Sequence, residues 1–421
     1  MDSAERRIVA FAAGSHGLVH TYELSIPILL TVWIAEFSTT AATLGLVVTV
    51  GYGLFGVGAL PGGILVDRFG SKPLILGSLA GMAGSFLLAS LAPNLLTLAL
   101  ALGAWGVTAS VYHPAGLALI SRSIDRRGAA LGYHGIGGNL GIALGPLATV
   151  LLLLAFDWAT VMALLTLPAA VVAAYGVTVD VDATTAGSGS AATEKDDETE
   201  VDDAPRVTAS SVVGDTRTLL AGGFLIVFAF VTFSGLYYRA FLTFLPDLLG
   251  EVLDGLVDVR FLDPGSPYAE EFDLARYLYV AVLMVGVFGQ YLGGRIADRM
   301  RPERALIVVM AALAGLALLF VPASGTAGTF LAVSLLLGVA LFTVQPLSQA
   351  TVAAYSPPDA RGLSFGYTYL GIFGVGSLGA ALSGTVLTRA GSAELFVVLA
   401  GIAAMGSLSA LAVVRYATRR D

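Results

Sequence analysis

The sequence predicts an all-α membrane protein whose twelve transmembrane helices form two six-helix repeats. Three observations predict this fold class: an apolar composition, twelve long apolar stretches, and charged blocks that recur at a nearly constant spacing. Of the 421 residues, 56% are apolar and 12% are charged, and the mean hydropathy is +0.84. Soluble domains are roughly a quarter charged. The composition, which includes no cysteine, therefore excludes a soluble enzyme, a disulfide scaffold, a cysteine-ligated metal site and a disordered protein.

Twelve stretches are long and apolar enough to cross a bilayer, which takes about 20 mainly apolar residues in a helix. A chain in lipid must satisfy its own backbone hydrogen bonds, and the alternating pattern of a membrane barrel is absent, so helices are predicted. The first stretch is too long, and too polar in its middle, for a cleavable signal peptide. The predicted spans are 8–35, 41–66, 73–92, 95–121, 128–155, 158–178, 217–247, 274–297, 303–322, 326–351, 361–388 and 392–416.

Two polar segments interrupt this pattern and set the predicted domains. Residues 179–216 are too polar to bury a core, and we predict an acidic, disordered cytoplasmic linker there. Residues 248–273 are predicted to form a second acidic loop, with a turn at Pro264-Gly265. The predicted organisation is a six-helix bundle over 1–178, the linker over 179–216, and a second six-helix bundle over 217–421.

Lysine and arginine set the predicted orientation, because cytoplasmic loops carry an excess of both. With the termini inside, 18 of these residues lie on the cytoplasmic side, and only Arg260, Arg276 and Arg389 lie outside. Arg239 remains within a helix. We therefore expect a multi-pass protein of the plasma membrane with both termini in the cytoplasm.

The chain repeats one unit. The block Gly62–Arg68 recurs as Gly293–Arg299 at an offset of 231, and the block Asp125–Tyr133 recurs as Asp359–Tyr367 at an offset of 234. Chance glycine matches are easy in a glycine-rich chain, but two charged blocks in the same order are not. The six-helix unit is therefore predicted to be duplicated, as in transporters that are built from parallel repeats.

The loop between the second and third helices carries a motif that points to a family. It reads Gly63-Ile64-Leu65-Val66-Asp67-Arg68-Phe69-Gly70-Ser71-Lys72, and its second copy has Arg301 in place of the later glycine. On this motif the chain resembles the major facilitator superfamily over essentially its whole length. Within that family, Tyr112-His113-Pro114 and the stretch 137–147 look like the fosmidomycin-resistance group of exporters. The resemblance implies a secondary transporter whose two halves rock about a midplane site.

Resemblance to the family also implies a cytoplasmic gate at this loop. Asp67 would pair with cations on neighbouring helices in one arrangement of the two halves and release them in the other. A simpler alternative is that Arg68 and Lys72 merely anchor the topology. The residues expected to act in gating are Gly63, Asp67, Arg68, Gly70, Lys72, Arg122, Arg127, Asp298, Arg299 and Arg361.

Ionisable residues inside transmembrane helices are costly, which makes them functional candidates. His16, His20 and Glu23 are spaced i, i+4 and i+7 and so share one face of the first helix. All four histidines lie in the first half of the chain. In the superfamily, helices 1, 4, 7 and 10 line a central cavity. The resemblance therefore implies that substrate or protons bind at His16, His20, Glu23, Tyr112, His113, Tyr238, Arg239, Gln345 and Gln349.

Two pairs of interpretations remain open for these residues. Glu23 is the predicted proton carrier and Arg239 a site for an anionic substrate group, or the two form a fixed ion pair that locks helix 1 to helix 7. His113 either takes part in binding or makes a hydrogen bond across helices 4 and 5, to Asn139 or His134. For His134 itself we expect a structural role.

The fifth helix carries Gly141, Gly145 and Pro146, which is similar to the G-x-x-x-G-P core of antiporters in the superfamily. The trailing glycine pair of that pattern is absent, which weakens the inference of export. The simpler interpretation is a packing seam of small residues with a proline kink.

The acidity of the chain has a local source. Residues 180–215 hold ten acids and two bases, which equals the whole net charge of −8. Acidic aqueous segments, together with 2 Lys against 20 Arg, resemble those of halophilic archaea, where salt screens dense charge. The net charge therefore marks a solvated tether and carries no information about a ligand.

Other classes of protein fit less well. The chain has no G-x-x-x-x-G-K-S/T string, so ATP is not expected to drive transport directly. The string Gly362–Gly366 matches a serine-hydrolase elbow, but that elbow needs a strand and a histidine partner. A metal site from His16, His20, Glu23 and His113, in a metal-ion carrier or a membrane metalloenzyme, is a lesser alternative, as is a substrate sensor without flux.

Together these observations predict a monomeric secondary transporter in the lipid bilayer, with no cofactor and no nucleic-acid partner. Protons are the expected coupling ion, and the expected activity is export by antiport of a small amphipathic or anionic compound. Proton-coupled uptake of an organic anion, organised by Arg239, is the alternative.

Overall fold

The computed structural model of the protein describes residues 1–124, 127–181, 216, 219, 223–256, 272–356 and 361–418. Within these residues the chain is helical and has no strand. Most of the predicted linker over 179–216 lies outside the described residues. Twelve helical segments are long and apolar enough to cross a membrane, which confirms the predicted fold class. They are Ser3–Glu36, Ala41–Val66, Ser71–Ser90, Leu95–Ser123, Gly128–Leu153, Trp158–Val177, Phe224–Thr243, Leu274–Ala297, Pro302–Ala323, Ala327–Tyr355, Leu363–Arg389 and Ser392–Ala417.

Several spans consist of more than one helical element: the breaks fall at Gly58, Val111 and Leu165, and at the π-helical and 3-10 turns over 370–377. The elements of the first half are α1 (Ser3–Glu36), α2 (Ala41–Val57), α3 (Ala59–Phe69), α4 (Ser71–Ser90), α5 (Leu95–Ser110), α6 (Tyr112–Ser123), α7 (Arg127–Leu153), α8 (Trp158–Leu164) and α9 (Thr166–Val177). The elements of the second half are α12 (Phe224–Thr243), α13 (Leu245–Leu256), α14 (Leu274–Ala297), α15 (Pro302–Ala323), α16 (Ala327–Tyr355), α17 (Arg361–Tyr369), η2 (Leu370–Gly374), η3 (Val375–Ser377), α18 (Leu378–Arg389) and α19 (Ser392–Ala417).

Side-chain caps explain where several helices begin. Asp2 accepts a hydrogen bond from the Glu5 amide while the Glu5 carboxylate accepts one from the Asp2 amide, which is a capping box at the start of α1. Thr40, Asn94 and Asp157 cap α2, α5 and α8 more simply, each with one side-chain oxygen that accepts a hydrogen bond from a backbone amide of the first turn. These caps fix the helix ends at the aqueous edges of the bundle.

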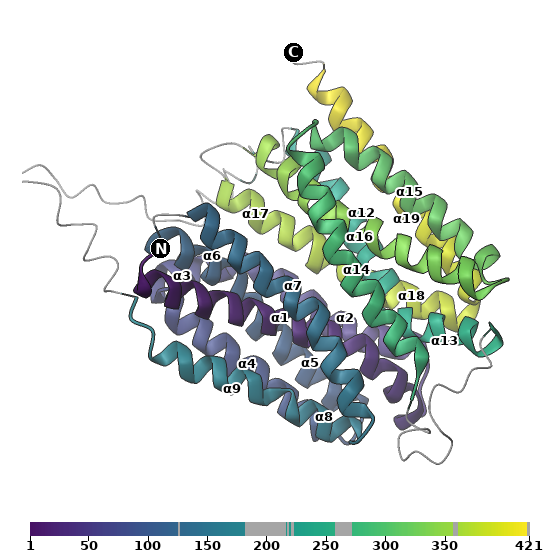
Figure 1. Cartoon of the computed structure of the whole chain (residues 1–421), viewed down its shortest axis with the longest axis horizontal. Helices are drawn as coiled ribbons and strands as arrows, with labels where there is room; N and C mark the ends of the chain where they lie inside the picture. Colours follow the sequence, from purple (N-terminus) through teal and green to yellow (C-terminus); the bar gives the residue numbers. More distant parts are fainter. Residues whose placement is uncertain are drawn as a thin grey trace, which may run out of the picture.

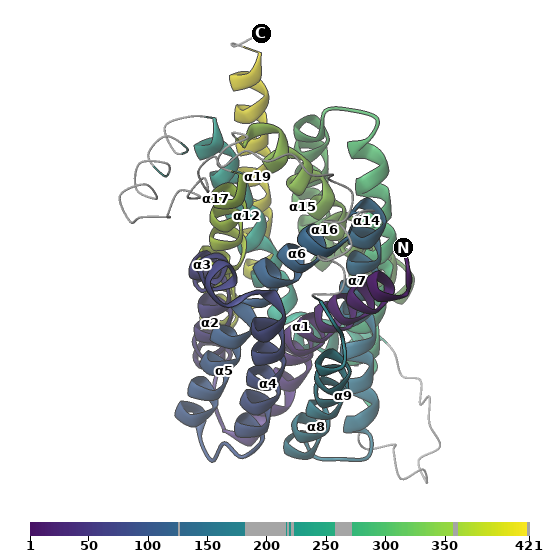
Figure 2. The ribbon, with the colours of Figure 1, turned by 90° about the vertical axis from the view of Figure 1, so that its left-hand side faces the viewer.

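The helices lie in two groups (Figures 1 and 2). Elements α1 to α9 pack among themselves, as do elements α12 to α19, and the two groups meet where α2 lies against α18 and α7 lies against α14. Because the number of spans is even, α1 begins and α19 ends at the same end of the bundle (Figure 1). This arrangement places α1 and α12, the first span of each half, near the centre, where they contact each other.

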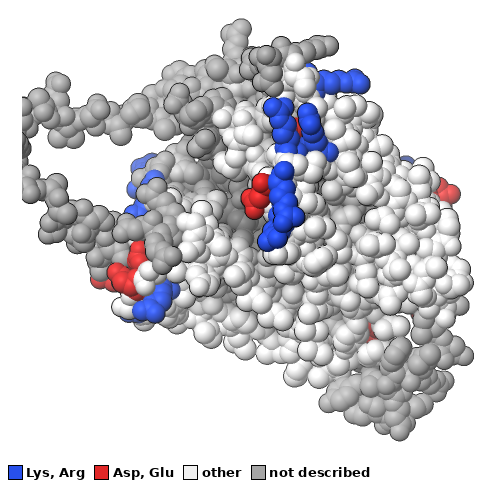
Figure 3. All heavy atoms as spheres, turned by 45° about the horizontal axis from the view of Figure 1, so that its top comes forward, with Lys and Arg blue, Asp and Glu red and all other residues white. Residues whose placement is uncertain are grey.

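The end of the bundle that carries the termini also carries most of the charge. Exposed side chains there include Arg68, Arg122, Arg295, Asp298 and Arg299. Figure 3 shows that the lysines and arginines gather in separate patches on this face, while other described atoms are largely uncharged. Such a distribution suits a protein whose flanks lie in lipid.

One predicted boundary is wrong. The sequence predicts that a span covers 217–247 and that an acidic loop covers 248–273, but the structure ends α12 at Thr243 and builds a separate helix, α13. Pro246 is the second residue of α13, where its missing amide hydrogen costs nothing. Leu248, Leu249 and Leu253 share a buried face of α13. Its acids lower the mean hydropathy without breaking the helix, which is why the sequence suggested a loop.

Candidate functional site

The polar side chains of α1 form the centre of the site. His16, His20 and Glu23 lie on one face of the helix, as their spacing predicts. His20 is 6% exposed and Glu23 is fully buried, although Glu23 is ionisable and lies in the middle of a transmembrane span. A buried carboxylate needs compensating partners, and the structure provides two of them, one from each half of the chain.

The first partner of Glu23 is Arg239 on α12. An Arg239 Nη2 group donates to Glu23 Oε1, and both side chains are buried, so one ion pair ties the first half of the protein to the second. The Tyr52 ring packs on the guanidinium, 3.7 Å from its central carbon to the ring centre, and Tyr238 lies at 5.3 Å. Arg239 Nε is buried without a hydrogen-bond partner among the described residues. The guanidinium therefore retains a donor that no described residue accepts.

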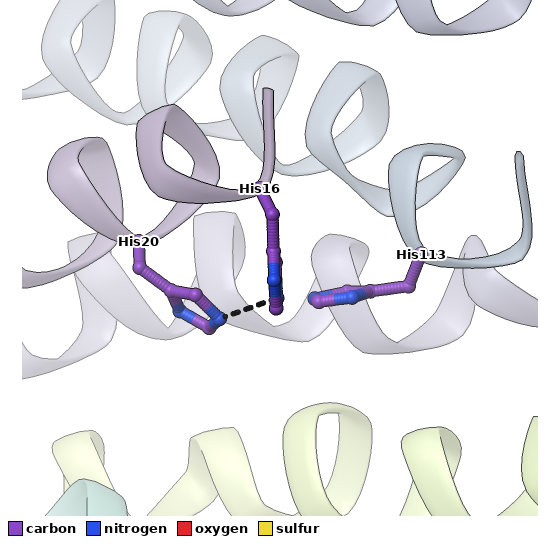
Figure 4. Close-up of side chains that lie close together, drawn as sticks. All are labelled: His16, His20 and His113. Carbon is purple, nitrogen blue, oxygen red and sulfur yellow. Dashed lines mark hydrogen bonds between the residues drawn. The ribbon is translucent and has the colours of Figure 1, made fainter. Parts of the chain in front are cut away.

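The second partner of Glu23 is His20 on the same helix. His20 Nδ1 lies 2.7 Å from Glu23 Oε2, and His20 Nε2 lies 3.1 Å from His16 Nε2. His113, in the first turn of α6, completes a triangle whose ring centres are 5.2 Å from His16 and 5.7 Å from His20. Figure 4 shows the three rings pointing toward one another from two helices, with His16 between the other two.

Tyr112 and His134 both stack against the ring of His16. The Tyr112 hydroxyl donates to the carbonyl of Ala12 and lies 3.2 Å from His134 Nε2. The His134 ring stacks on His16 at 4.0 Å, and the His134 carbonyl oxygen lies 2.8 Å from His16 Nδ1. A hydrogen bond between the fourth and fifth spans was one interpretation of His113. It is made instead by its neighbour Tyr112, which links α6 to α7.

Aromatic rings from the second half cover the cluster, and the sequence did not single them out. His113 stacks on Tyr369 with ring centres 5.2 Å apart, and Phe373 lies parallel to it at 6.4 Å. Phe373 belongs to η2, a single turn of π-helix, a feature that often occurs at functional sites. Glycines at 371, 374 and 376 around Phe373 are the sequence signal that could have drawn attention to this segment.

The two glutamines of helix 10 do not join this group. Gln345 and Gln349 on α16 are exposed, whereas Glu23 and Arg239 are buried. Gln345 accepts a hydrogen bond from Gln290 of α14 at 2.9 Å. The structure therefore brings together residues from α1, α6 and α12, which belong to the first, fourth and seventh spans. It leaves those of α16, the tenth span, outside the polar cluster.

The expected gating residues are only partly described. Gly63 and Gly70 lie in and directly after α3, and Arg68 is exposed with its guanidinium 5.3 Å from the Phe69 ring centre. Lys72 Nζ donates to the carbonyls of Val177 and Val179, so Lys72 ties α4 to the end of α9. Arg122, Asp298 and Arg299 are exposed. The side chains of Asp67, Arg127 and Arg361 lie outside the described residues.

The small residues of α7 form a close contact with α1. A Cβ atom on Gly141 would collide with the carbonyl oxygen of Gly17, and one on Gly145 would collide with Thr21. Pro146 lies within α7 in the same region. A mostly apolar groove of about 630 Å³ opens along this seam, between α1, α7 and α9. The residues that line this groove include neither Glu23 nor Arg239, which are both buried.

The fold and the buried polar site define a polytopic membrane protein with the architecture of a transporter. The chain belongs to the Major Facilitator Superfamily, whose sequence model matches residues 10–377 and 261–421. The predicted family is thereby confirmed, and the place among fosmidomycin-resistance-like exporters and the halophilic origin stay predictions. No curated protein sequence matches the chain.

Solved structures of transporters share the fold. The nucleoside transporter NupG, crystallised as a point mutant, is 14% identical with a TM-score of 0.74, over 98% of this chain and all of that one. A D-xylose–proton symporter is 16% identical with a TM-score of 0.72, over 97% of this chain and 96% of that one. A bacterial homologue of the human lysosomal transporter Spinster, in an inward-facing and unoccupied state, is 14% identical with a TM-score of 0.71, over 99% and 95%.

Proposed function

We propose that the protein is a secondary active transporter that works by alternating access and is coupled to protons. The observation that carries the proposal is the buried ion pair between Glu23 of the first half and Arg239 of the second. If the two halves rock about a central site, the groups that link them must change partners during the cycle. No other buried ion pair joins the two halves within the described residues, so this pair is where exchange would occur.

The chemistry of the pair suggests which substrate would exchange with it. An anionic group can replace Glu23 on Arg239, because a guanidinium binds carboxylates and phosphates through several donors, and Nε is available. Glu23 would then need another cation, and we propose a proton. Anion and proton would promote each other's binding, since linkage between two sites is reciprocal. This coupling favours symport of an organic anion, the second of the two activities that the sequence suggests.

Export by antiport has separate support in α7. Gly141, Gly145 and Pro146 keep α7 tightly against α1, which carries Glu23. The string resembles that of antiporters, and a cationic amphipathic compound that competes with the proton for Glu23 would give exchange rather than symport. Direction and substrate charge are thus linked: anions predict symport, and cations predict antiport.

A flux experiment distinguishes these possibilities. The protein would be reconstituted in liposomes, and uptake from a panel of organic anions, nucleosides, sugars and organic cations measured with an inward proton gradient and with the gradient collapsed. We expect at least one anion to accumulate only with the gradient. If the flux of every substrate were the same with and without the gradient, that result would contradict proton coupling.

Two variants test the role of the ion pair. Arg239→Gln should abolish accumulation of the anion, while Arg389→Gln, which changes an arginine at the end of α18, should leave it unchanged. Glu23→Gln should retain exchange of labelled for unlabelled substrate and lose gradient-driven accumulation. A wild-type KM in Arg239→Gln would remove the anion site from this position.

The gate and the orientation form a second part of the proposal. We propose that both termini face the cytoplasm of a plasma-membrane protein, and that the motif around Asp67 closes that face. Asp67→Asn should lower flux without lowering the amount of folded protein, and unchanged flux would contradict a gate. The supporting observations are the charged patches on the end that carries the termini (Figure 3) and the excess of lysine and arginine in the loops assigned to it.

A further inference from the structure

The histidine cluster presents an electrostatic problem that neutral side chains cannot solve. His16 Nδ1 faces the carbonyl oxygen of His134 at 2.8 Å, and His20 Nδ1 faces a carboxylate oxygen of Glu23 at 2.7 Å. The backbone oxygen only accepts hydrogen bonds, and so does the Glu23 carboxylate while it is ionised in its pair with Arg239, so in this state each Nδ1 carries a hydrogen and donates it. In a neutral imidazole the other nitrogen is then a bare acceptor. The two Nε2 atoms, which lie 3.1 Å apart, would therefore direct their lone pairs at each other, and a cation must lie between them.

A third nitrogen indicates which kind of cation fits. His113 Nε2 is buried and has no hydrogen-bond partner among the described residues, and the whole residue is 6% exposed. A shared proton would satisfy His16 and His20 and leave His113 unpaired, at the cost of a buried polar group. A metal ion would use all three side chains, because imidazole is a preferred ligand of zinc, copper and nickel.

We propose that His16, His20 and His113 bind one divalent transition-metal ion of the zinc type, through one imidazole nitrogen each. Three such nitrogens lie within 4.8 Å of one another, and a tetrahedral zinc site needs them about 3.4 Å apart, which a shift of about 1 Å achieves. The 3.1 Å between His16 and His20 needs almost no change. Three histidines leave the fourth position of the metal open for water or an anion.

The surroundings of the ligands match those of a metal site. A metal-bound histidine usually donates its second ring hydrogen to a carboxylate or a backbone carbonyl, which orients the ring. His20 makes the first kind of contact, with Glu23, and His16 makes the second, with His134. The Glu23 carboxylate also supplies negative charge behind the site. All three ligands belong to the first half of the chain, and Tyr369 of the second half covers His113, so the metal would enter when the halves separate.

Metal binding can be measured directly, without any transport assay. The full-length protein would be purified in detergent, stripped with a chelator, and titrated with zinc against a chromogenic competitor, with magnesium as the comparison ion. We expect one zinc per chain by elemental analysis, no magnesium, and a rise in melting temperature with zinc. Cobalt in place of zinc should give the visible absorption of an imidazole-ligated tetrahedral ion. Absence of a one-to-one zinc complex in the wild type would overturn the proposal.

Variants locate the site, with the fourth histidine as the matched control. His20→Gln and His113→Gln, on different helices, should each lower zinc affinity at least about 100-fold, and Glu23→Gln about 10- to 100-fold. His134→Gln removes a neighbouring imidazole but retains the backbone carbonyl, and should change affinity less than about threefold by the same reasoning. Equal zinc affinity in the wild type and in folded His20→Gln and His113→Gln would overturn the assignment. Because flux is not measured, this result is independent of the proposed direction and coupling of transport.

Discussion

At the scale of single residues, the buried contact between the two halves depends on how the Glu23 carboxylate is shared between two partners. Glu23 uses one oxygen for Arg239 and the other for His20, so a change at any of the three affects the other two. A buried pair of this kind contributes little net stability, because desolvation offsets the attraction between the charges. Its energetic effect appears when one partner is removed and the other charge stays buried.

This sharing predicts that the effects of substitutions at Glu23 and Arg239 are not additive in a double-mutant cycle. Glu23→Gln and Arg239→Gln should each destabilise the protein by about 3–5 kcal/mol, because each leaves one uncompensated charge in the bilayer core. The double variant should be markedly more stable than the sum of the two losses predicts. Thermal unfolding of the purified protein, followed by intrinsic fluorescence, measures all four proteins in the cycle.

The control for this cycle is the exposed Arg304 on α15, for which Arg304→Gln should shift the melting temperature little, as surface substitutions usually do. Additive losses in the double variant would mean that Glu23 and Arg239 do not interact, and would remove the link between the two halves.

At the scale of elements, the short helix α13 introduces a pH dependence. Asp247 lies outside the membrane spans, and its Oδ2 atom is buried without a hydrogen-bond partner among the described residues. Burial, and then the nearby charge of Asp273, raise the pKa of Asp247 from its usual 3.8 to about 7, although Arg276 opposes the shift. Asp273 itself pairs with Arg276 at 3.0 Å, which weakens that opposition.

Stability should therefore fall as the pH rises from about 4 to about 7. In this window the folded protein keeps the Asp247 proton that the unfolded chain has released, so protonation favours the folded state at the low end. The slope contributed by one such group reaches at most about 1.4 kcal/mol per pH unit. Asp247→Asn should flatten the slope of melting temperature against pH, while Asp254→Asn, at an exposed position of α13, should leave it unchanged. An identical slope in Asp247→Asn would mean that another group titrates.

The seam between α1 and α7 leads to a prediction about packing. Gly141→Ala should lower the free energy of unfolding by about 1–3 kcal/mol, because its Cβ would meet the backbone of Gly17 and the helices must separate. Gly132→Ala is the matched control on the same helix, since a Cβ there meets nothing within 4 Å. Melting temperatures in detergent measure both variants. Equal stability of the two would mean that α7 can move away from α1 at no cost.

The sequence predicted those parts of the structure that depend on local pattern. Apolar stretches of full length marked every span, and the spacing of His16, His20 and Glu23 placed them on one helical face, because helix geometry alone decides that. Whether Arg239 meets Glu23 depends on how two halves dock, so the sequence left it open. Tyr52 on α2 and Phe373 on η2 were missed because they belong to the second and eleventh spans, which the family scheme does not place around the cavity. The π-helical turn of Phe373 has no distinct periodicity in the sequence.

At the scale of the whole molecule, a second seam lies between the two halves of the chain, where α2 packs against the span that runs from α17 to α18. A Cβ on Gly56 would collide with the backbone of Gly374, and Thr49 Oγ1 lies 3.1 Å from the carbonyl oxygen of Ser377. Backbones that approach this closely fit together in one arrangement and cannot slide gradually. If the protein alternates, the seam must therefore open as a unit.

A crosslink across this seam tests alternation in a chain that has no cysteine of its own. A Cβ on Gly53 would lie 3.2 Å from Ser377 Oγ, close to the distance of about 3 Å between Cβ and the far sulfur of a disulfide. Oxidised Gly53→Cys/Ser377→Cys should lose flux at least about tenfold, because the halves can no longer separate, and a reductant should restore it. The matched pair Gly14→Cys/Val172→Cys, whose atoms would lie 3.6 Å apart within the first half, should transport normally when oxidised. Undiminished flux through the fully oxidised seam pair would show that the two halves do not need to part there, and alternation would have to use the contact between α7 and α14 instead.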